Sequence, residues 1–176
     1  MVYVFLADGF EEVEAVAPVD ILRRSGAEVK TVGVSGKQVK GAHGIIVTAD
    51  IELSEISDNA EMIVLPGGPG TSNLEKSEGV QKAIDRAVKS GATIGAICAA
   101  PSILGHKGLL KGKKAVCYPG FEAELYGAEV MDTQVCEDGQ FITANGPGAA
   151  FAFGLKLAER LNKNAEKVKS GMKILL

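Results

Sequence analysis

Short apolar runs recur along the chain, most of them with no polar residue between the apolar ones. Uninterrupted runs of this kind are typical of strands that are buried on both faces of a sheet. We expect strands at residues 2–6, 29–34, 45–47, 62–65, 93–97 and 114–117.

Helical spacing of apolar residues separates several of these strands. Val80, Ile84 and Val88 form a one-sided stripe on a helix that Gly91 ends. Further helices are expected at residues 11–25, from just after Cys98, and at residues 148–161 and 165–172. Residues 135–143 predict a hairpin that turns at Asp138-Gly139.

The alternation of buried strands with helices predicts the fold class. It indicates one α/β domain over residues 1–176, with a mostly parallel sheet, helices on both faces and a small antiparallel hairpin. With 46 % hydrophobic residues, the chain has enough apolar material for such a core.

Composition excludes some classes of function. The formal net charge is -3 and like charges do not cluster, so we expect binding neither to nucleic acid nor to an anionic membrane. No apolar stretch approaches the roughly 18 residues of a membrane helix, and the start of the chain lacks the pattern of a signal peptide. The three cysteines are an odd number at wide spacing, which disfavours a disulfide framework or a metal site. The expected location is the cytoplasm.

In doubly wound sheets, ligands bind beyond the carboxyl ends of the strands. Three segments of this chain follow predicted strands in that way, namely Asp8-Gly9, residues 66–70 and residues 97–101. These are the candidate site segments.

Cys98 lies where a strand runs through small residues directly into a helix, as in a nucleophile elbow. The strained turn of an elbow exposes the nucleophile, and small neighbours such as Ala99 leave room for it. The helix N-terminus is expected to lower the pKa of the thiol below about 8.5. On this segment alone, an inert buried cysteine fits equally well.

The loop Pro66-Gly67-Gly68-Pro69-Gly70 has neither the G-x-G-x-x-G spacing nor the lysine of a P-loop. A tight turn that brings a backbone N–H, such as that of Gly68, to a reacting oxygen is the better functional interpretation. A plain strand-to-helix turn explains the segment equally well.

Glu14 falls on the predicted inner face of the first helix, within an apolar stripe of Val13, Ala17 and Ile21. A carboxyl group there must find a partner or have a raised pKa, and a raised pKa would let it exchange a proton near neutral pH. The alternative is a structural acid satisfied by backbone groups or by Arg24.

Histidine is nearly absent from the chain. His43 lies in a turn-rich stretch and His106 follows the predicted elbow helix, and both are expected to be structural or exposed. No Ser-His-Asp arrangement or metal-ligand spacing is visible.

Several motifs together resemble the DJ-1/ThiJ/PfpI superfamily, most closely its DJ-1 subfamily. They are Ala7-Asp8-Gly9-Phe10-Glu11-Glu12-Val13-Glu14 with Pro18-Val19-Asp20, Val64-Leu65-Pro66-Gly67-Gly68, Ala96-Ile97-Cys98-Ala99-Ala100-Pro101 and Gly146-Pro147-Gly148. They follow the order of the family and span nearly the whole chain.

The resemblance implies a flavodoxin-like three-layer sandwich that forms a homodimer and needs no cofactor. It implies that Cys98 is a nucleophilic, oxidation-prone cysteine hydrogen-bonded to Glu14. It also implies that Gly68 and Ala99 offer backbone N–H groups to an oxyanion. Members of the family are described as cofactor-free glyoxalases, protein deglycases or oxidative-stress sensors, and in other branches as proteases or chaperones.

Two positions depart from the family pattern. Protease-type members carry a histidine directly after the cysteine, where this chain has Ala99, which argues against peptidase activity. Several DJ-1 members have a histidine where this chain has Tyr118, which we expect to orient the substrate together with Gly67. Tyrosine is a poor base at neutral pH, so this change puts the rate of a glyoxalase reaction in question, though not the reactivity of Cys98.

The resulting hypothesis is a glyoxalase-like or deglycase-like enzyme that acts on small aldehydes such as methylglyoxal, or on their protein adducts, through Cys98. One alternative is a redox sensor in which Cys98 forms a sulfinic acid held by Glu14. Another is a chaperone-like dimer, which needs a sizeable exposed apolar patch. The sequence does not separate the enzyme from the sensor, because both use the same residues.

Overall fold

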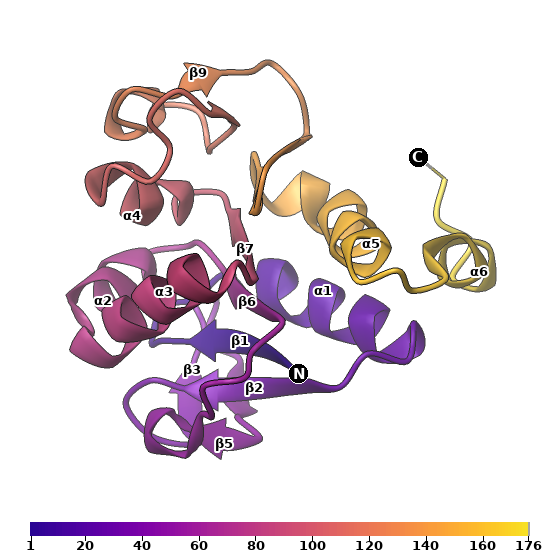
Figure 1. Ribbon diagram of the computed structural model, residues 1–176. Coiled ribbons are helices and arrows are strands. Elements are labelled where there is room, and N and C mark those ends of the chain that lie inside the picture. Colours follow the sequence, from indigo (N-terminus) through magenta and orange to yellow (C-terminus); the bar gives the residue numbers. More distant parts are fainter. Residues whose placement is uncertain (176) are drawn as a thin grey trace.

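The computed structural model describes residues 1–175, with a seven-stranded sheet at the centre (Figure 1). Its strands are β1 (Val2–Leu6), β2 (Val29–Gly33), β5 (Ile51–Glu52), β6 (Met62–Leu65), β7 (Thr93–Ile97), β10 (Val135–Asp138) and β11 (Phe141–Ala144). They lie in the order β10-β11-β7-β6-β1-β2-β5, and every neighbouring pair is parallel except β10 with β11. The mostly parallel sheet and the antiparallel hairpin are therefore confirmed.

Helices cover both faces of this sheet (Figure 1). One face packs against α1 (Glu12–Arg24), α5 (Ala150–Arg160) and α6 (Ala165–Gly171), and the other against α2 (Thr71–Lys76), α3 (Glu78–Ser90) and α4 (Pro101–His106). Successive side chains of a strand point to opposite faces. In β1, accordingly, Val4 and Leu6 belong to the first core and Tyr3 and Phe5 to the second. This is the expected flavodoxin-like three-layer fold. Within residues 1–175, no helix is long and apolar enough to span a membrane.

The ends of α3 show how the local sequence sets the bounds of an element. The Ser77 hydroxyl accepts a hydrogen bond from the Val80 N–H, and Gly91 ends the helix with φ of +74°. Serine before the first turn and a left-handed glycine after the last are favoured helix ends. Val80 and Ile84 are fully buried, as their spacing predicts.

Two predicted strands lie outside the central sheet. The run at 45–47 forms β4 (Ile46–Thr48), which pairs antiparallel with β3 (Gln38–Lys40). The predicted strand at 114–117 is reduced to β8 (Lys114–Ala115), which pairs with β9 (Glu129–Val130). The side chains of β4 are exposed or half-buried, so this apolar run does not mark a core strand. The two-residue β5 supplies the sheet edge instead.

The path of the chain brings the first two candidate loops together. β1 has β2 on one side and β6 on the other, so the winding of the sheet reverses between β1 and β6. The Gly70 N–H donates to the Gly9 carbonyl (2.8 Å), and the Glu11 N–H donates to the Gly67 carbonyl (3.0 Å). Ligands in such folds bind outside the carboxyl ends of the strands at this reversal.

Candidate active site

Cys98 lies on a strained turn between β7 and α4. Its φ is +65°, in the left-handed region that residues with side chains rarely adopt, and it is only 8 % exposed. The Cys98 N–H donates to the Ala144 carbonyl and the Tyr118 N–H donates to the Cys98 carbonyl, both at 2.8 Å. Backbone strain of this kind persists only where the surroundings enforce it, and it clusters at functional sites. The turn has the geometry of the predicted elbow.

The glycine loop after β6 lies directly against this turn. A Cβ on Gly67 would come within 2.6 Å of the Cys98 Cβ and within 2.7 Å of Glu14 Oε2, so a side chain has no room there. Gly68 has φ of +82°, which glycine adopts without strain. The backbone N–H groups of Gly68 and Ala99 both act to lower the pKa of the Cys98 thiol and so favour its thiolate. The glycine-rich loop had singled out the N–H of Gly68, and the family resemblance implied that of Ala99.

Glu14 projects from α1 into the same space and is fully buried. The Gly67 N–H donates to its Oε2 (2.9 Å), whereas Oε1 has no hydrogen-bond partner within residues 1–175. A buried carboxylate oxygen without a partner is costly. The Cys98 thiol lies within hydrogen-bonding reach of this carboxyl group and is the group placed to satisfy it.

The buried face of α1 differs in part from the predicted stripe. Val13 is 43 % exposed, whereas Ile21 is fully buried as predicted. The helix packs against α5, where Gly154 lies against Pro18 and Ile21. This close approach of two helices, which the spacing of apolar residues does not reveal, sets the rotation of α1.

The electrostatics of Cys98 and Glu14 are coupled. Burial raises the pKa of Glu14 to about 7, against the opposing hydrogen bonds from Cys98 and from the Gly67 N–H. Burial and then the charge of Glu14 raise the pKa of Cys98 to about 12, although the Gly68 and Ala99 N–H groups act in the opposite direction. The expected lowering of the Cys98 pKa is therefore wrong. The six-residue α4 contributes less than burial and the nearby acid.

Between these two pKa values, Glu14 and Cys98 hold one proton between them. The pair releases its first proton near pH 7 and keeps the second throughout the physiological range. When the remaining proton lies on Glu14, the sulfur is a thiolate that faces two N–H donors. The arrangement can thus form a nucleophile by proton transfer within the pair.

Tyr118 lies at the rim of the site, next to the elbow, and Glu122 follows it near Cys117. The Tyr118 ring is half-exposed and lies beside Gly146, where a Cβ would come within 3.1 Å of the ring. Glu122 accepts a hydrogen bond from the Gly120 N–H (2.8 Å). After burial, its charge is the second cause that raises the pKa of Cys117, to about 11.

One cluster near the start of α1 escaped the sequence analysis. Glu12 accepts hydrogen bonds from the His43 backbone N–H (2.8 Å) and from the Ile45 N–H (3.4 Å), and it lies 2.9 Å from the His43 Nδ1. Ligand atoms of Glu11, Glu12 and His43 lie within 4.8 Å of one another, the arrangement of a candidate metal site. Both oxygens of Glu12 already accept protein donors, so the cluster serves to join the β3–β4 hairpin to α1.

His106 is exposed, in line with the expectation, and it also makes contacts that the sequence did not predict. It lies at the end of α4 between two carboxyl groups, those of Glu75 and Glu124. No sequence signal finds this contact, because the partners are 31 and 18 residues away.

Comparison with known proteins supports one assignment throughout. The profile of the DJ-1/PfpI family matches residues 1–160. The chain is 39 % identical over 178 residues to the Drosophila melanogaster protein dj-1beta, covering 98 % of this chain and 95 % of that protein. It superposes on the crystal structure of Drosophila DJ-1beta with a TM-score of 0.94 and 33 % identity, covering 99 % and 98 % of the two chains.

Two further relatives are named for an activity. The chain is 34 % identical to the glutathione-independent glyoxalase DJR-1.2 of Caenorhabditis elegans, over 94 % of this chain and 89 % of that protein. It is 30 % identical to a protein of Pyrococcus abyssi named as a deglycase, over 86 % of this chain and 93 % of that protein. With its fold, its motifs and these relatives in agreement, the chain belongs to the DJ-1/PfpI family.

Proposed function

We propose that this protein is a cofactor-free enzyme of the glyoxalase or deglycase type, which uses Cys98 to act on 2-oxoaldehydes such as methylglyoxal or on their protein adducts. The observation that carries the proposal is the buried Glu14 carboxyl group beside Cys98, with a pKa raised to about 7. An acid with that pKa can both accept and return a proton at neutral pH. The names of the nematode and archaeal relatives support the same class of reaction.

The first step joins sulfur to the aldehyde carbon. The Cys98 thiol passes its proton to the Glu14 carboxylate as the sulfur attacks, and the carbonyl π electrons move onto oxygen. The Gly68 and Ala99 N–H groups stabilise this oxyanion. Glu14 then returns the proton to the oxygen, which leaves a hemithioacetal and a carboxylate.

The second step is an internal redox change. The Glu14 carboxylate removes the hydrogen of the former aldehyde carbon as a proton, the electron pair forms a C=C bond, and Glu14 delivers the proton to the neighbouring carbonyl oxygen to give an enediol. Glu14 then removes the proton of the hydroxyl on the sulfur-bearing carbon, which becomes the thioester carbonyl, and delivers it to the second carbon to give the lactoyl thioester of Cys98. Water then cleaves the thioester to lactate and the free thiol. One carbon is oxidised and its neighbour reduced, so no external oxidant is needed.

Lactate formation from methylglyoxal by the purified protein tests the proposal. Wild-type turnover should rise with pH through about 7, as Glu14 ionises. Cys98→Ser should lower it by roughly a thousandfold or more. The matched control is Cys136→Ser, since this half-buried thiol on β10 lies outside the proposed site. Turnover that survives in Cys98→Ser would rule out this mechanism.

Oxidation of Cys98 is a second candidate function that the same geometry favours. Two molecules of hydrogen peroxide would convert the thiol to a sulfinic acid with release of two waters. A protonated Glu14 and the Gly68 and Ala99 N–H groups are the donors for the sulfinate oxygens. A mass gain of two oxygen atoms on Cys98 under mild peroxide, combined with no aldehyde turnover, would favour the sensor over the enzyme.

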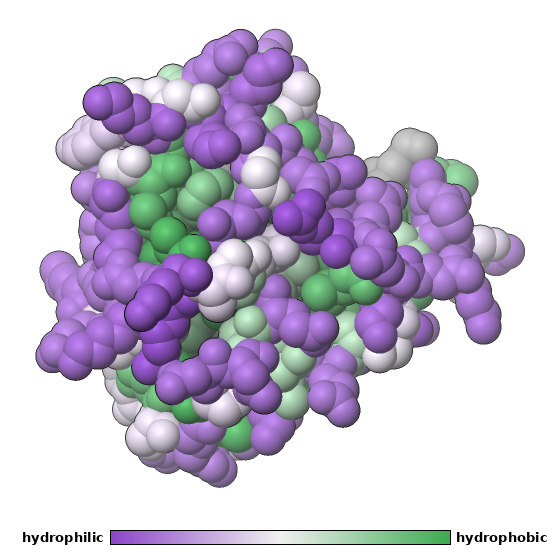
Figure 2. All heavy atoms as spheres, viewed as in Figure 1, coloured by the Kyte–Doolittle hydropathy of each residue, from purple (hydrophilic) through white to green (hydrophobic). Residues whose placement is uncertain are grey.

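The face drawn in Figure 2 gives little support to the third candidate, a chaperone-like dimer. Hydrophilic side chains cover most of the face in Figure 2, and hydrophobic side chains show in separate patches between them. We retain the homodimer itself as a proposal, because Val13 and Val16 on α1 and Ile45 and Ile46 by the β3–β4 hairpin are exposed. The proposed compartment is the reducing cytoplasm, which suits a thiol nucleophile.

A further inference from the structure

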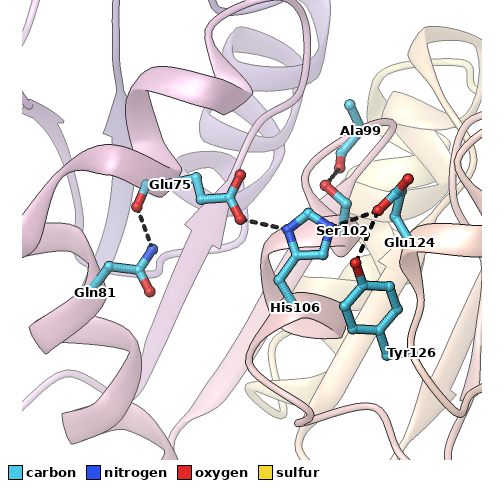
Figure 3. Close-up of polar contacts among 7 residues, drawn as sticks. All are labelled: Glu75, Gln81, Ala99, Ser102, His106, Glu124 and Tyr126. Carbon is cyan, nitrogen blue, oxygen red and sulfur yellow. Dashed lines mark hydrogen bonds and ion pairs between the residues drawn. The ribbon is translucent and has the colours of Figure 1, made fainter.

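His106, at the end of α4, contacts two other segments at once. Its Nδ1 lies 2.5 Å from Glu75 Oε1 on α2, and its Nε2 lies 2.8 Å from Glu124 Oε2 in η2 (Glu122–Glu124) (Figure 3). The Tyr126 ring packs beside the imidazole with centroids 5.1 Å apart, and its hydroxyl donates to the same Glu124 oxygen at 3.5 Å.

Each of the three joined segments leads directly to the candidate site. α2 follows the loop 66–70, α4 follows Cys98 and Ala99, and η2 follows Tyr118. The imidazole therefore connects the segments that supply the nucleophile, the N–H donors and the rim residue, at positions further along the chain than the site residues themselves.

The connection from His106 to the Cys98 turn is short and rigid. Ser102 Oγ donates to the Ala99 carbonyl (2.7 Å) in a buried hydrogen bond that holds the first turn of α4 onto the elbow (Figure 3). Near the other end of α4, a Cβ on Gly105 would lie 2.1 Å from the Glu124 carbonyl oxygen, so the two backbones are in contact. Because α4 has only six residues, a displacement at His106 reaches the elbow within two turns of helix.

The double contact depends on the protonation of His106. A carboxylate only accepts hydrogen bonds, and neutral imidazole has a single N–H, so only the imidazolium donates to Glu75 and Glu124 together. Loss of the proton leaves a ring lone pair facing a carboxylate. The hydrogen bonds to Glu75 and Glu124 raise the pKa of His106 above its usual value of 6.5.

The remaining neighbours do not replace this pairing. Lys107, the residue that follows α4, pairs with Asp85 of α3 (2.8 Å), and Gln81 donates to the Glu75 backbone carbonyl (2.9 Å). Within residues 1–175, neither Glu75 nor Glu124 forms an ion pair with a group other than His106.

We propose that His106 is a pH-sensitive positioning residue whose imidazolium clamps the loop 66–70, the Cys98 turn and the Tyr118 segment together, and whose deprotonation releases one arm of the clamp. The direction of the pH dependence follows from the raised pKa of His106 in the folded protein. The stabilisation is complete below about pH 6.5 and is lost as pH rises through the higher pKa of the folded state. The link to catalysis rests on the proposed function, whereas the clamp is measurable without substrate.

The first test is an NMR titration of the imidazole protons. The chain has two histidines, so His43→Gln leaves His106 as the single imidazole. We expect His106 to titrate with a midpoint above pH 6.5, and this midpoint should move to lower pH in Glu75→Gln and in Glu124→Gln. A midpoint at or below 6.5 before either substitution would overturn the clamp.

The second test is amide hydrogen exchange between pH 5.5 and 8.5, corrected for the intrinsic rate. Glu14 also titrates near pH 7 and accepts the Gly67 N–H, so the test uses a Glu14→Gln background. In that background, the hydrogen-bonded amides of Gly67, Cys98 and Tyr118 should lose protection by roughly three- to tenfold through the His106 midpoint. His106→Gln should lack this step and exchange at the faster level throughout. Lys107→Gln, which removes the ion pair of the residue next to His106, should keep the step. A step that persists in His106→Gln contradicts the proposal.

The third readout separates the clamp from the chemistry. Turnover of methylglyoxal by His106→Gln should fall below wild type at pH 6 and match it at pH 8.5, where the wild-type clamp is also released. A purely structural histidine would lower turnover equally at both pH values. Absence of turnover in the wild type would refute the proposed reaction while leaving the titration and exchange results to decide the clamp.

Discussion

At the scale of single residues, Glu14 couples stability to pH. Burial raises its pKa from 4.5 to about 7, so the folded protein binds this proton more tightly than the unfolded chain. The resulting stability is complete below pH 4.5 and is lost as pH rises through about 7, by a total of about 3 kcal/mol. Glu14→Gln abolishes this titration while an amide oxygen can still accept from the Gly67 N–H. Urea unfolding between pH 4.5 and 8 should therefore show Glu14→Gln gaining about that amount relative to the wild type.

Glu12 provides a control of opposite sign on the same helix. Burial raises its pKa, but the hydrogen bonds from the His43 ring and from backbone N–H groups outweigh burial and lower it. The stability that Glu12 contributes is present above its unfolded pKa and is lost as pH falls. Glu12→Gln should therefore be less stable than the wild type at pH 8, with the deficit shrinking toward acid pH. If the free energies of unfolding of the wild type and Glu14→Gln changed in parallel with pH, this would contradict a raised pKa of Glu14.

Tyr118 is the rim residue that the sequence analysis expected to orient the substrate. Its backbone N–H donates to the Cys98 carbonyl, so its side chain starts beside the elbow. A histidine here would add a base with a pKa near 6.5. Tyr118→His should raise kcat/KM for methylglyoxal by roughly tenfold or more at pH 7.5, whereas Tyr118→Phe should change it by less than about threefold because tyrosine is a poor base. Equal rates for the histidine and phenylalanine variants would show that this position does not limit the reaction.

At the scale of elements, the close packing of α1 on α5 sets the position of Glu14. A Cβ on Gly154 would lie 2.8 Å from the Ile21 Cδ1 and 3.1 Å from the Pro18 Cα. We expect Gly154→Ala to lower the free energy of unfolding by about 1–3 kcal/mol, or roughly 2–10 °C in Tm. Gly171→Ala, at the exposed last residue of α6 with no atom within 4 Å, should be neutral or raise stability by up to about 1 kcal/mol. Calorimetry on both variants checks the contrast, and equal Tm values would show that the helices have room to separate.

The same elements explain which parts of the fold the sequence could predict. Strands such as β1 and β7 are continuous apolar runs buried on both faces, and α3 has both a stripe and clear ends, so their patterns are strong. The pattern failed at β4, where exposed Ile46 belongs to a small separate sheet. Elements such as β5 and α2 have too few residues for a periodic signal. Their structure depends on contacts with distant segments.

At the scale of the whole molecule, the site follows from the topology. The reversal of winding beside β1 brings Glu14, Gly68 and Cys98 together from three separate segments, which is why the candidate residues could be named in advance. The protonation of the pair could not be predicted. Burial and the charge of Glu14 oppose the helix N-terminus at Cys98, and their balance depends on how closely those segments pack. The same holds for His106, whose partners come from two other elements.

The exposed apolar residues near α1 lead to a prediction about assembly. Ile46 is 62 % exposed, and the hydrogen bonds of Glu12 hold its hairpin against α1, where Val16 is also exposed. If a second copy covers these residues, Ile46→Asp buries a charge in the interface and should weaken the dimer by roughly 100-fold or more. Sedimentation velocity over a range of concentrations measures this shift. Val130→Asp is the matched control, since Val130 is 43 % exposed on a separate small sheet and should leave the dimer intact. A wild type that sediments as a monomer at every concentration, or an Ile46→Asp variant as dimeric as Val130→Asp, would mean that this face does not join two copies.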